Sequence, residues 1–358
     1  MSIPLVSVLI DTYNHERFIE QAIASVLEQD VPPSEMEIIV VDDGSTDGTP
    51  RIVQKFVPRV RHLRKANGGQ ASAFNAGIPE TQGQIVAFLD GDDWWAKGKL
   101  RAVLDVLGKN PEVGAVGHGF YEVDSGSNTL AKVVPDRDYR FDLRDIETAR
   151  LGTQLGCFLG TSRFTARASL LHQILPVPVE LVVEADEYLF TLAPAIAPVM
   201  VLSQPLFHYR LHENNLYMIQ SNDSVRLRSK QRALETLLRA LPEALARFGI
   251  SEAVIKIALA YLKADVERMK LSLDGGKPWQ TFAAERAAYA LDNSRASFGH
   301  RLFKSLMLGL TLVMPPRRFY GLRRWYSARG LRRLRKVLGE PKPSGPAIQT
   351  MIANGKRS

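Results

Sequence analysis

The chain has 358 residues, of which 45% are hydrophobic, enough for one large domain and a smaller one. Its single cysteine, Cys157, excludes an internal disulfide and is typical of a reducing compartment. No apolar run approaches the roughly 18–20 residues of a membrane span, and the first residues resemble a strand more than a signal peptide.

The net charge of +8 is unevenly distributed along the chain. Between Asn293 and Gly339 there are twelve Lys or Arg residues and no Asp or Glu, so the rest of the chain carries a net charge of about −4. This asymmetry indicates that the basic segment meets a surface or partner that carries phosphate.

Strand and helix patterns alternate over the first 120 residues. Apolar runs predict strands at 6–10, 37–41, 60–63 and 85–89, and helical spacing predicts helices at 16–29, 70–78 and 97–107, with one more starting near Pro50. This alternation predicts an α/β fold, a mostly parallel sheet with helices on both faces. From residue 224, leucines at helical intervals predict a helical region, and the Pro- and Gly-rich stretch 341–358 is predicted to be mobile.

Polar and acidic side chains follow the predicted strands directly, at the sheet edge where ligands bind in such folds. Asp90, Asp92 and Asp93 come after the fourth strand. Carboxylates gathered at one edge repel each other unless a cation binds there, and Mg²⁺ and Mn²⁺ prefer such oxygens. Asp90 and Asp92 are therefore candidate metal ligands, and Gly91 would let the backbone approach the ligand closely. The alternative is a solvated Asp-Gly turn without a ligand.

Residues after the other strands have similar alternatives. The ring of Tyr13 could stack on a planar base or lie partly buried at a rim. Asp43 could accept a hydrogen bond from the N3–H of uracil or form an Asx turn before Gly44. The segment Asn67, Gly68, Gly69 and Gln70 could present backbone N–H groups to a ligand or form a plain tight turn.

Four segments, in their order along the chain, resemble the nucleotide-sugar-binding half of family 2 glycosyltransferases. They are VSVLIDTYN, IIVVDDGSTDGT, NGGQASAFNAG and IVAFLDGDDWW. The resemblance covers about residues 4–215 and implies an inverting enzyme with a GT-A type fold. It implies that Asp11, Thr12, Tyr13 and Asp43 hold uridine, and that Asp90 and Asp92 contact the ribose and the metal. The family more often has Pro at the position of Asp11. We therefore expect the chain to divide into three parts. These are a transferase domain at 1–222 (donor half 1–120, acceptor half 121–222), a basic helical region at 223–340, and the tail 341–358.

The acceptor half offers a candidate general base. By position alone, Asp186 and Glu187 could be acids that favour a helix start, but the family resemblance implies that Asp186 removes the acceptor proton. It also implies that His212 completes the metal coordination and that Arg210 faces phosphate or acceptor; a structural histidine is the alternative. Thr161 and Ser162 are acceptor-side candidates, or an ordinary loop. Trp94 and Trp95 could stack on sugar faces, and one of them could equally be core.

Residues 301–336 combine arginines with Leu, Phe, Trp and Tyr. Such composition is typical of segments that lie on an anionic membrane, with Phe319, Trp325 or Tyr326 as inserting residues. A packed helical cap is the alternative, and nucleic-acid binding lacks a fold signature.

The sequence thus predicts a cytoplasmic, peripheral membrane glycosyltransferase that uses a UDP-sugar and Mn²⁺ or Mg²⁺ on a lipid-linked or polysaccharide acceptor. The rival interpretation is an inactive transferase-like domain that acts as a membrane-associated binding protein. A nicotinamide dehydrogenase is disfavoured because the first strand–helix turn lacks G-x-G-x-x-G. The sequence does not predict an oligomeric state.

Overall fold

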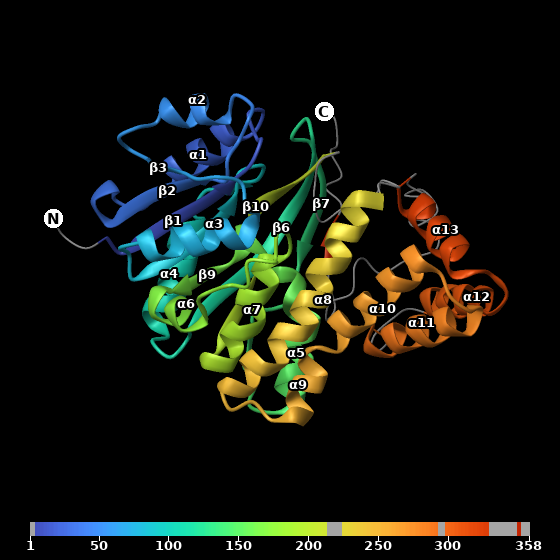
Figure 1. The fold of residues 1–358 in the computed structure, drawn as a ribbon. Coiled ribbons are helices and arrows are strands. Elements are labelled where there is room, and N and C mark those ends of the chain that lie inside the picture. The colour runs from blue at the N-terminus through green and yellow to red at the C-terminus, as the bar shows by residue number, and fades with distance from the viewer. Residues whose placement is uncertain (1–3, 213–223, 293–297, 329–348, 352–358) are drawn as a thin grey trace, which may run out of the picture.

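The computed structural model describes residues 4–212, 224–292, 298–328 and 349–351. Four parallel strands form the first part of the sheet, in the order β3 (Arg61–Arg64), β2 (Met36–Asp42), β1 (Val6–Thr12) and β4 (Ile85–Asp90). The helices α1 (Ile19–Leu27), α2 (Thr49–Gln54) and α3 (Gln70–Gly77) connect these strands (Figure 1). Both faces of β1 are covered, which explains its nearly continuous apolar sequence. The predicted alternation of strands and helices is confirmed.

The second part of the sheet is mixed. β4 pairs antiparallel with β9 (Thr165–Arg167), which pairs with β6 (Ala115–Asp124), and β6 runs parallel to β10 (Val199–Leu211). β7 (Thr129–Val134) lies beside β6, while β8 (Tyr139–Phe141) and β5 (Trp94–Trp95) pair with β10. The remaining helices of this part are α4 (Lys99–Lys109), α5 (Ile146–Leu155), α6 (Ala168–Ile174) and α7 (Ala185–Ile196). The pairing of β10 with β5 returns a late segment of the chain to the loop that follows β4.

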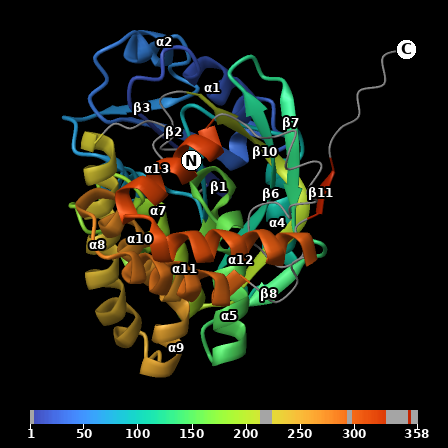
Figure 2. The same cartoon turned by 90° about the vertical axis from the view of Figure 1, so that its right-hand side faces the viewer.

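In the part of the chain that the structure describes, β10 is followed by the helices α8 (Ser224–Arg247), α9 (Glu252–Ala258), α10 (Ala260–Asp274), α11 (Pro278–Asp292), α12 (Phe298–Val313) and α13 (Pro316–Ala328). Leucines at helical spacing on α8 are buried against α7 and α10, and they belong to the same hydrophobic core as the sheet. Leu271, Ala284, Phe319 and Tyr320 form a second, smaller core among α10, α11 and α13. Figures 1 and 2 show α11–α13 on the side of α8 and α10 away from β1–β4. The predicted helical region is confirmed.

The C-terminal tail is only partly described. β11 (Gln349–Met351) pairs antiparallel with β7 inside the stretch that the sequence predicts to be mobile, and the other residues of 341–358 lie outside the described residues. The predicted boundary between 222 and 223 lies outside them as well. Among the helices that the structure describes, none is both long and apolar enough to cross a membrane.

Candidate active site

Four carboxylates meet where β1 and β4 end. The register of the two parallel strands places Asp11 opposite Asp90, and the turn after β4 adds Asp92 and Asp93. The backbone N–H of Gly91 donates to the carbonyl oxygen of Asp11 over 2.9 Å, which holds this turn against β1. The side chain of Thr12 leaves no room for a side chain at Gly91, since an added Cβ would lie 2.6 Å from its Oγ1.

Burial and mutual repulsion raise the pKa of three of these carboxyl groups, those of Asp11, Asp90 and Asp93. Burial, together with the charge of Asp92, raises the pKa of Asp11 to about 8. Burial, followed by the charge of Asp11, holds the pKa of Asp90 well above its ordinary value. The Oδ1 atom of Asp11 is buried and has no hydrogen-bond partner. A cation placed between these oxygens would remove the repulsion and satisfy the unpartnered oxygen.

Asp92 is held in its charged form. Burial acts to raise its pKa, but His15 and the hydrogen-bonded His212 outweigh burial and lower the pKa. His212 Nε2 lies 2.9 Å and His15 Nε2 3.9 Å from Asp92 Oδ2. The described residues contain no preformed group of three His, Cys, Asp or Glu ligands. A pair of carboxylates nevertheless suits Mg²⁺, which typically takes one or two protein carboxylates and completes its shell with water and phosphate oxygens. Asp90 and Asp92 therefore fit the predicted cation.

Asp43 organises the loop that precedes α3. Its carboxylate accepts hydrogen bonds from the backbone N–H groups of Gly68 and Gly69, at 3.0 and 2.7 Å, and from Lys65 Nζ at 2.6 Å. Gly69 has φ +83°, and an added Cβ would lie 2.4 Å from the Cα of Val182. A glycine is required here because a side chain is strained in this conformation and has no space. Tyr13 is 44% exposed and lines the same cavity as this loop.

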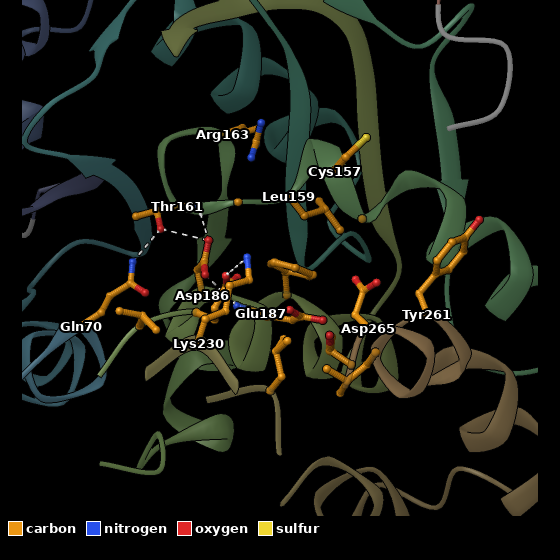
Figure 3. Close-up of a pocket in the computed structure, with 18 of the residues that line it drawn as sticks. Gln70, Cys157, Leu159, Thr161, Arg163, Asp186, Glu187, Lys230, Tyr261 and Asp265 are labelled. Atoms are coloured by element: carbon orange, nitrogen blue, oxygen red, sulfur yellow. Dashed lines mark hydrogen bonds and ion pairs between the residues drawn. The ribbon is translucent and has the colours of Figure 1, made fainter. Parts of the chain in front are cut away.

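Asp186 lies in the first turn of α7 and is held by two neighbouring segments. Thr161 donates to its Oδ2 from the backbone N–H over 3.0 Å and from Oγ1 over 3.2 Å. Gln70 donates to Thr161 Oγ1 over 3.1 Å and accepts from the backbone N–H of Ala185 over 2.9 Å. Figure 3 shows this chain of contacts from Gln70 through Thr161 to Asp186. Burial, followed by the charge of Glu184, raises the pKa of Asp186, which makes it a stronger base.

The residue before α7 is conformationally unusual. Glu184 has φ 60°, in the left-handed region, which costs a non-glycine residue about 1–2 kcal/mol. Its carboxylate pairs with Lys230 of α8 over 2.7 Å, and both side chains are largely buried. The helical region therefore helps to fix the backbone that carries Asp186.

Several predicted residues have their side chains directed into the protein. Trp95 is 3% exposed, and its Nε1–H donates to the carbonyl oxygen of Ser162. The buried Lys99 Nζ lies 3.8 Å from the Trp95 ring centroid, where burial holds its pKa well below the ordinary value. Trp94 stacks on His208 at 4.7 Å. Arg210 is 2% exposed and donates from Nε to the carbonyl oxygen of Asp92. This hydrogen bond fixes Arg210 to the turn that carries Asp90 and Asp92.

One cavity of about 1360 Å³ contains the carboxylate cluster and Asp186. The predicted residues that line it are Asp11, Thr12, Tyr13, Asp43, Asn67, Gly69, Gln70, Asp90, Asp92, Thr161, Ser162 and Asp186. Among the described residues, Gly68, Gly91, Trp94, Trp95, Arg210 and His212 are not part of its lining.

Sequence reasoning missed three residues of this site. His15 follows Asp11 by four positions, so its presence in the same loop was the available signal. Lys65 and Lys230 gave no signal, because their partners Asp43 and Glu184 are distant in the sequence.

Comparison with known proteins identifies the family. Residues 7–170 match the family model "Glycosyl transferase family 2". An uncharacterized glycosyltransferase of Nostoc sp. (strain PCC 7120) is 31% identical over 251 residues, which cover 68% of this chain and 76% of the relative. The chain belongs to glycosyltransferase family 2.

Another relative matches a smaller part of this chain, and two solved structures match most of it at lower sequence identity. The putative teichuronic acid biosynthesis glycosyltransferase TuaG of Bacillus subtilis is 43% identical over 108 residues, 29% of this chain and 42% of TuaG. S. aureus TarS 1-349 in complex with UDP-GlcNAc superimposes with a TM-score of 0.55 at 18% identity, covering 98% of each chain. Mannosyltransferase PcManGT of Pyrobaculum calidifontis, in complex with GDP-Man and Mn²⁺, gives a TM-score of 0.52 at 20% identity, covering 93% of this chain and 88% of PcManGT. These two structures confirm the GT-A type fold of this family 2 transferase.

Proposed function

We propose that this transferase is a metal-dependent, inverting enzyme of the hexosyltransferase type. It moves a sugar from a UDP-sugar to a hydroxyl group of a lipid-linked or cell-surface polysaccharide acceptor. The observation that carries the proposal is the presence, in one cavity, of the carboxylate cluster around Asp90 and Asp92 and of the half-buried Asp186, whose pKa is raised. The complexes of TarS with UDP-GlcNAc and of PcManGT with GDP-Man and Mn²⁺ support a nucleotide-sugar donor, and the name of TuaG supports a polysaccharide product.

The donor would lie across the ends of β1, β2 and β4. Tyr13 offers a ring for the base, and the loop from Asn67 to Gln70, fixed by Asp43, borders the same part of the cavity. Asp90 and Asp92 would hold Mn²⁺ or Mg²⁺, with His212 orienting Asp92. The ion would supply Lewis-acid stabilisation of the charge on the departing diphosphate.

Asp186 would act on the acceptor. Its carboxylate accepts the hydroxyl proton while the acceptor oxygen forms a bond to the anomeric carbon. The bond from that carbon to the diphosphate oxygen breaks, and the electron pair leaves with UDP. Attack from the face opposite the leaving group inverts the configuration. Thr161 keeps Asp186 Oδ2 in place during this transfer through its two hydrogen bonds.

The donor and metal assignments are tested by calorimetry of UDP and GDP with Mn²⁺, with Mg²⁺ and with a chelator. We expect UDP to bind only with metal, and Asp92→Asn to weaken metal-dependent binding by about tenfold or more. Asp105→Asn, an exposed acid on α4, is the matched control and should bind as wild type does. Equal UDP affinity with Mn²⁺ and with chelator would contradict the metal assignment, and tighter GDP binding would contradict the base assignment.

We also propose that the enzyme is cytoplasmic and lies on the membrane surface through residues 301–336. Leu302, Leu306 and Val313 are 52%, 66% and 77% exposed, and their spacing of four and seven residues places them on one face of α12. Burying such a side chain yields about 1.5–3 kcal/mol, and each nearby Lys or Arg adds about 1 kcal/mol on an anionic surface. Arg317 and Arg318 are exposed just beyond this apolar stripe.

The structure changes which residues of 301–336 are expected to insert into the membrane. Phe319 is fully buried in the second core, so the prediction that it enters the membrane is wrong. The side chains of Trp325 and Tyr326, and all of 329–336, lie outside the described part of the chain. Binding to phosphatidylglycerol vesicles should decrease with added salt and with Leu306→Glu, which places a charge in the apolar stripe. The control Glu180→Gln, at an exposed position outside α12, should leave vesicle binding unchanged. If the wild-type protein does not bind these vesicles at low salt, the membrane assignment is refuted.

A further inference from the structure

The guanidinium of Arg163 has no anionic partner in the part of the chain that the structure describes. Arg163 ends the short 3₁₀ helix η4 (Thr161–Arg163), is half-buried and lines the cavity. Its side chain makes no hydrogen bond or ion pair with the described residues, and its Nε is buried without an acceptor. Lys230, Arg268 and Arg323 also line the cavity, but each of them pairs with a carboxylate. Leaving a buried guanidinium N–H without an acceptor costs free energy, which an anion in the cavity would recover.

The three residues of η4 point in different directions. Thr161 donates to Asp186 of α7, and Ser162 Oγ donates to Asp93 Oδ2 over 2.7 Å, in the turn after β4. Successive residues of a 3₁₀ helix are a third of a turn apart, so Arg163 faces neither of these partners and points instead toward β6 and β10. Figure 3 shows Arg163 on the side of Thr161 away from Asp186. Arg163 therefore borders a part of the cavity that neither the proposed base nor the metal turn occupies.

Two aromatic rings hold the guanidinium in position. Its central carbon lies 4.7 Å from the ring centroid of Phe120 on β6 and 5.4 Å from that of Phe207 on β10. The backbone of Gly160 approaches from another side, where an added Cβ would lie 2.5 Å from NH2 of Arg163. Contacts with ring faces use none of the hydrogen-bond donors of the guanidinium. The part of the cavity lined by Phe120, Phe207 and Arg163, called here the Arg163 pocket, is thus built around a positioned cation.

The acids closest to η4 are engaged elsewhere. Asp93 accepts hydrogen bonds from Ser162 Oγ and from the backbone N–H of Arg210. Asp186 Oδ2 accepts both hydrogen bonds of Thr161. Neither carboxylate forms an ion pair with Arg163, so the partner that the guanidinium lacks has to come from a ligand.

The chemistry of the Arg163 pocket favours a carboxylate as that partner. A carboxylate has one negative charge and two oxygens that match the planar fork of one guanidinium. A phosphate monoester carries up to two negative charges, and the negative charges of Asp93 and Asp186 nearby oppose the second one. The diphosphate of the donor is assigned to the cation at Asp90 and Asp92, in the turn that Arg163 faces away from.

We propose that Arg163 binds the carboxylate of an acidic sugar and so selects a substrate that carries such a group. This inference rests on the proposed function, because it takes the cavity to hold a sugar nucleotide and a saccharide acceptor. The carboxylate belongs either to the sugar of the donor or to the acceptor residue that meets Asp186. Both sources present the same chemistry to the guanidinium, and the experiment separates them.

Two pairs of ligands, each differing in one carboxylate, test the proposal on the full-length protein with Mn²⁺. The donor pair is UDP-glucuronic acid and UDP-glucose, compared by calorimetry. The acceptor pair is methyl glucuronide and methyl glucoside, compared by NMR titration in the presence of UDP. We expect the acidic member of one pair to bind at least about tenfold more tightly than its neutral member. A preference in the donor pair assigns the carboxylate to the donor, and a preference in the acceptor pair assigns it to the acceptor. If neither pair shows a preference, the proposal is overturned.

Variants of Arg163 show whether the preference comes from this residue. Arg163→Met removes the charge and keeps an unbranched side chain beside the two rings, and Arg163→Lys keeps the charge without the fork. We expect Arg163→Met to weaken binding of the acidic member about tenfold more than binding of the neutral member, and Arg163→Lys to retain part of the preference. The matched control is Arg150→Met, at an exposed position on α5 outside the cavity lining, which should keep the full preference.

An equal loss of both members in Arg163→Met would mean that Arg163 contacts the diphosphate or only stabilises the fold, and it would overturn the proposal. Thermal unfolding of each variant shows whether the fold is kept. If wild type binds UDP with Mn²⁺ but prefers neither acidic ligand, this inference fails while the proposed function stands. If wild type does not bind UDP with metal, the proposed function itself is wrong.

Discussion

Replacing Glu187 by Gln should change how the stability of this transferase depends on pH. Glu187 lies in the first turn of α7 and lines the cavity. Burial, followed by the charges of Glu184 and Asp186, raises its pKa from 4.5 to about 8. Between these two values the folded chain holds a proton that the unfolded chain releases. The free energy of unfolding therefore decreases as the pH rises from about 4.5 to about 8.

The size of the effect follows from the same interval. Each pH unit corresponds to about 1.4 kcal/mol, so the interval from 4.5 to about 8 gives an upper bound of about 5 kcal/mol. Part of the Glu187 side chain faces the open cavity, where water stabilises its charge, so we expect about 2 kcal/mol. Gln keeps the shape of the side chain and cannot titrate, and so it removes this contribution.

Urea unfolding at about pH 5 and about pH 8.5, without metal or nucleotide, measures the difference. Wild type should lose about 2 kcal/mol more than Glu187→Gln over this range. Other buried acids, such as Asp11, titrate in both proteins, so the comparison isolates Glu187. Glu180→Gln, at an exposed position, should behave as wild type does. If Glu187→Gln and wild type lose the same stability, burial does not govern this carboxyl and the argument is refuted.

Two further predictions concern the site itself. Asp186→Asn should lower kcat by about 10²–10⁴ with UDP affinity unchanged, because the proposed donor contacts do not include Asp186; steady-state kinetics with wild-type turnover would rule it out as the base. Gly69→Ala should destabilise the chain and weaken UDP binding, because the added Cβ would lie 2.4 Å from the Cα of Val182 and would displace the loop that Asp43 holds. The control is Gly108→Ala in α4, where an added Cβ meets nothing within 4 Å. This variant should stabilise the protein by about 0.5–1 kcal/mol. Equal midpoints of thermal unfolding for the two variants would contradict this reasoning.

The sequence by itself determined the local features of this family 2 transferase. Continuous apolar runs followed by acids predicted parallel strands whose carboxyl ends carry chemistry, and Asp11, Asp90 and Asp92 do meet there. These features depend on residues that are close in the chain, where the spacing of apolar and polar side chains directly reports burial. Leucine spacing after residue 224 predicted the helical region for the same reason.

Only the tertiary structure decided which side chains face the cavity. Trp95 lies only two positions after Asp93, yet the pairing of β5 with β10 places its side chain in the core. Arg210 and Phe319 are buried by elements far away in the chain, and Lys230 reaches Glu184 from α8. Such contacts depend on strand register and helix packing between distant segments. A single sequence does not encode their geometry locally, because many pairings would bury the same apolar residues equally well.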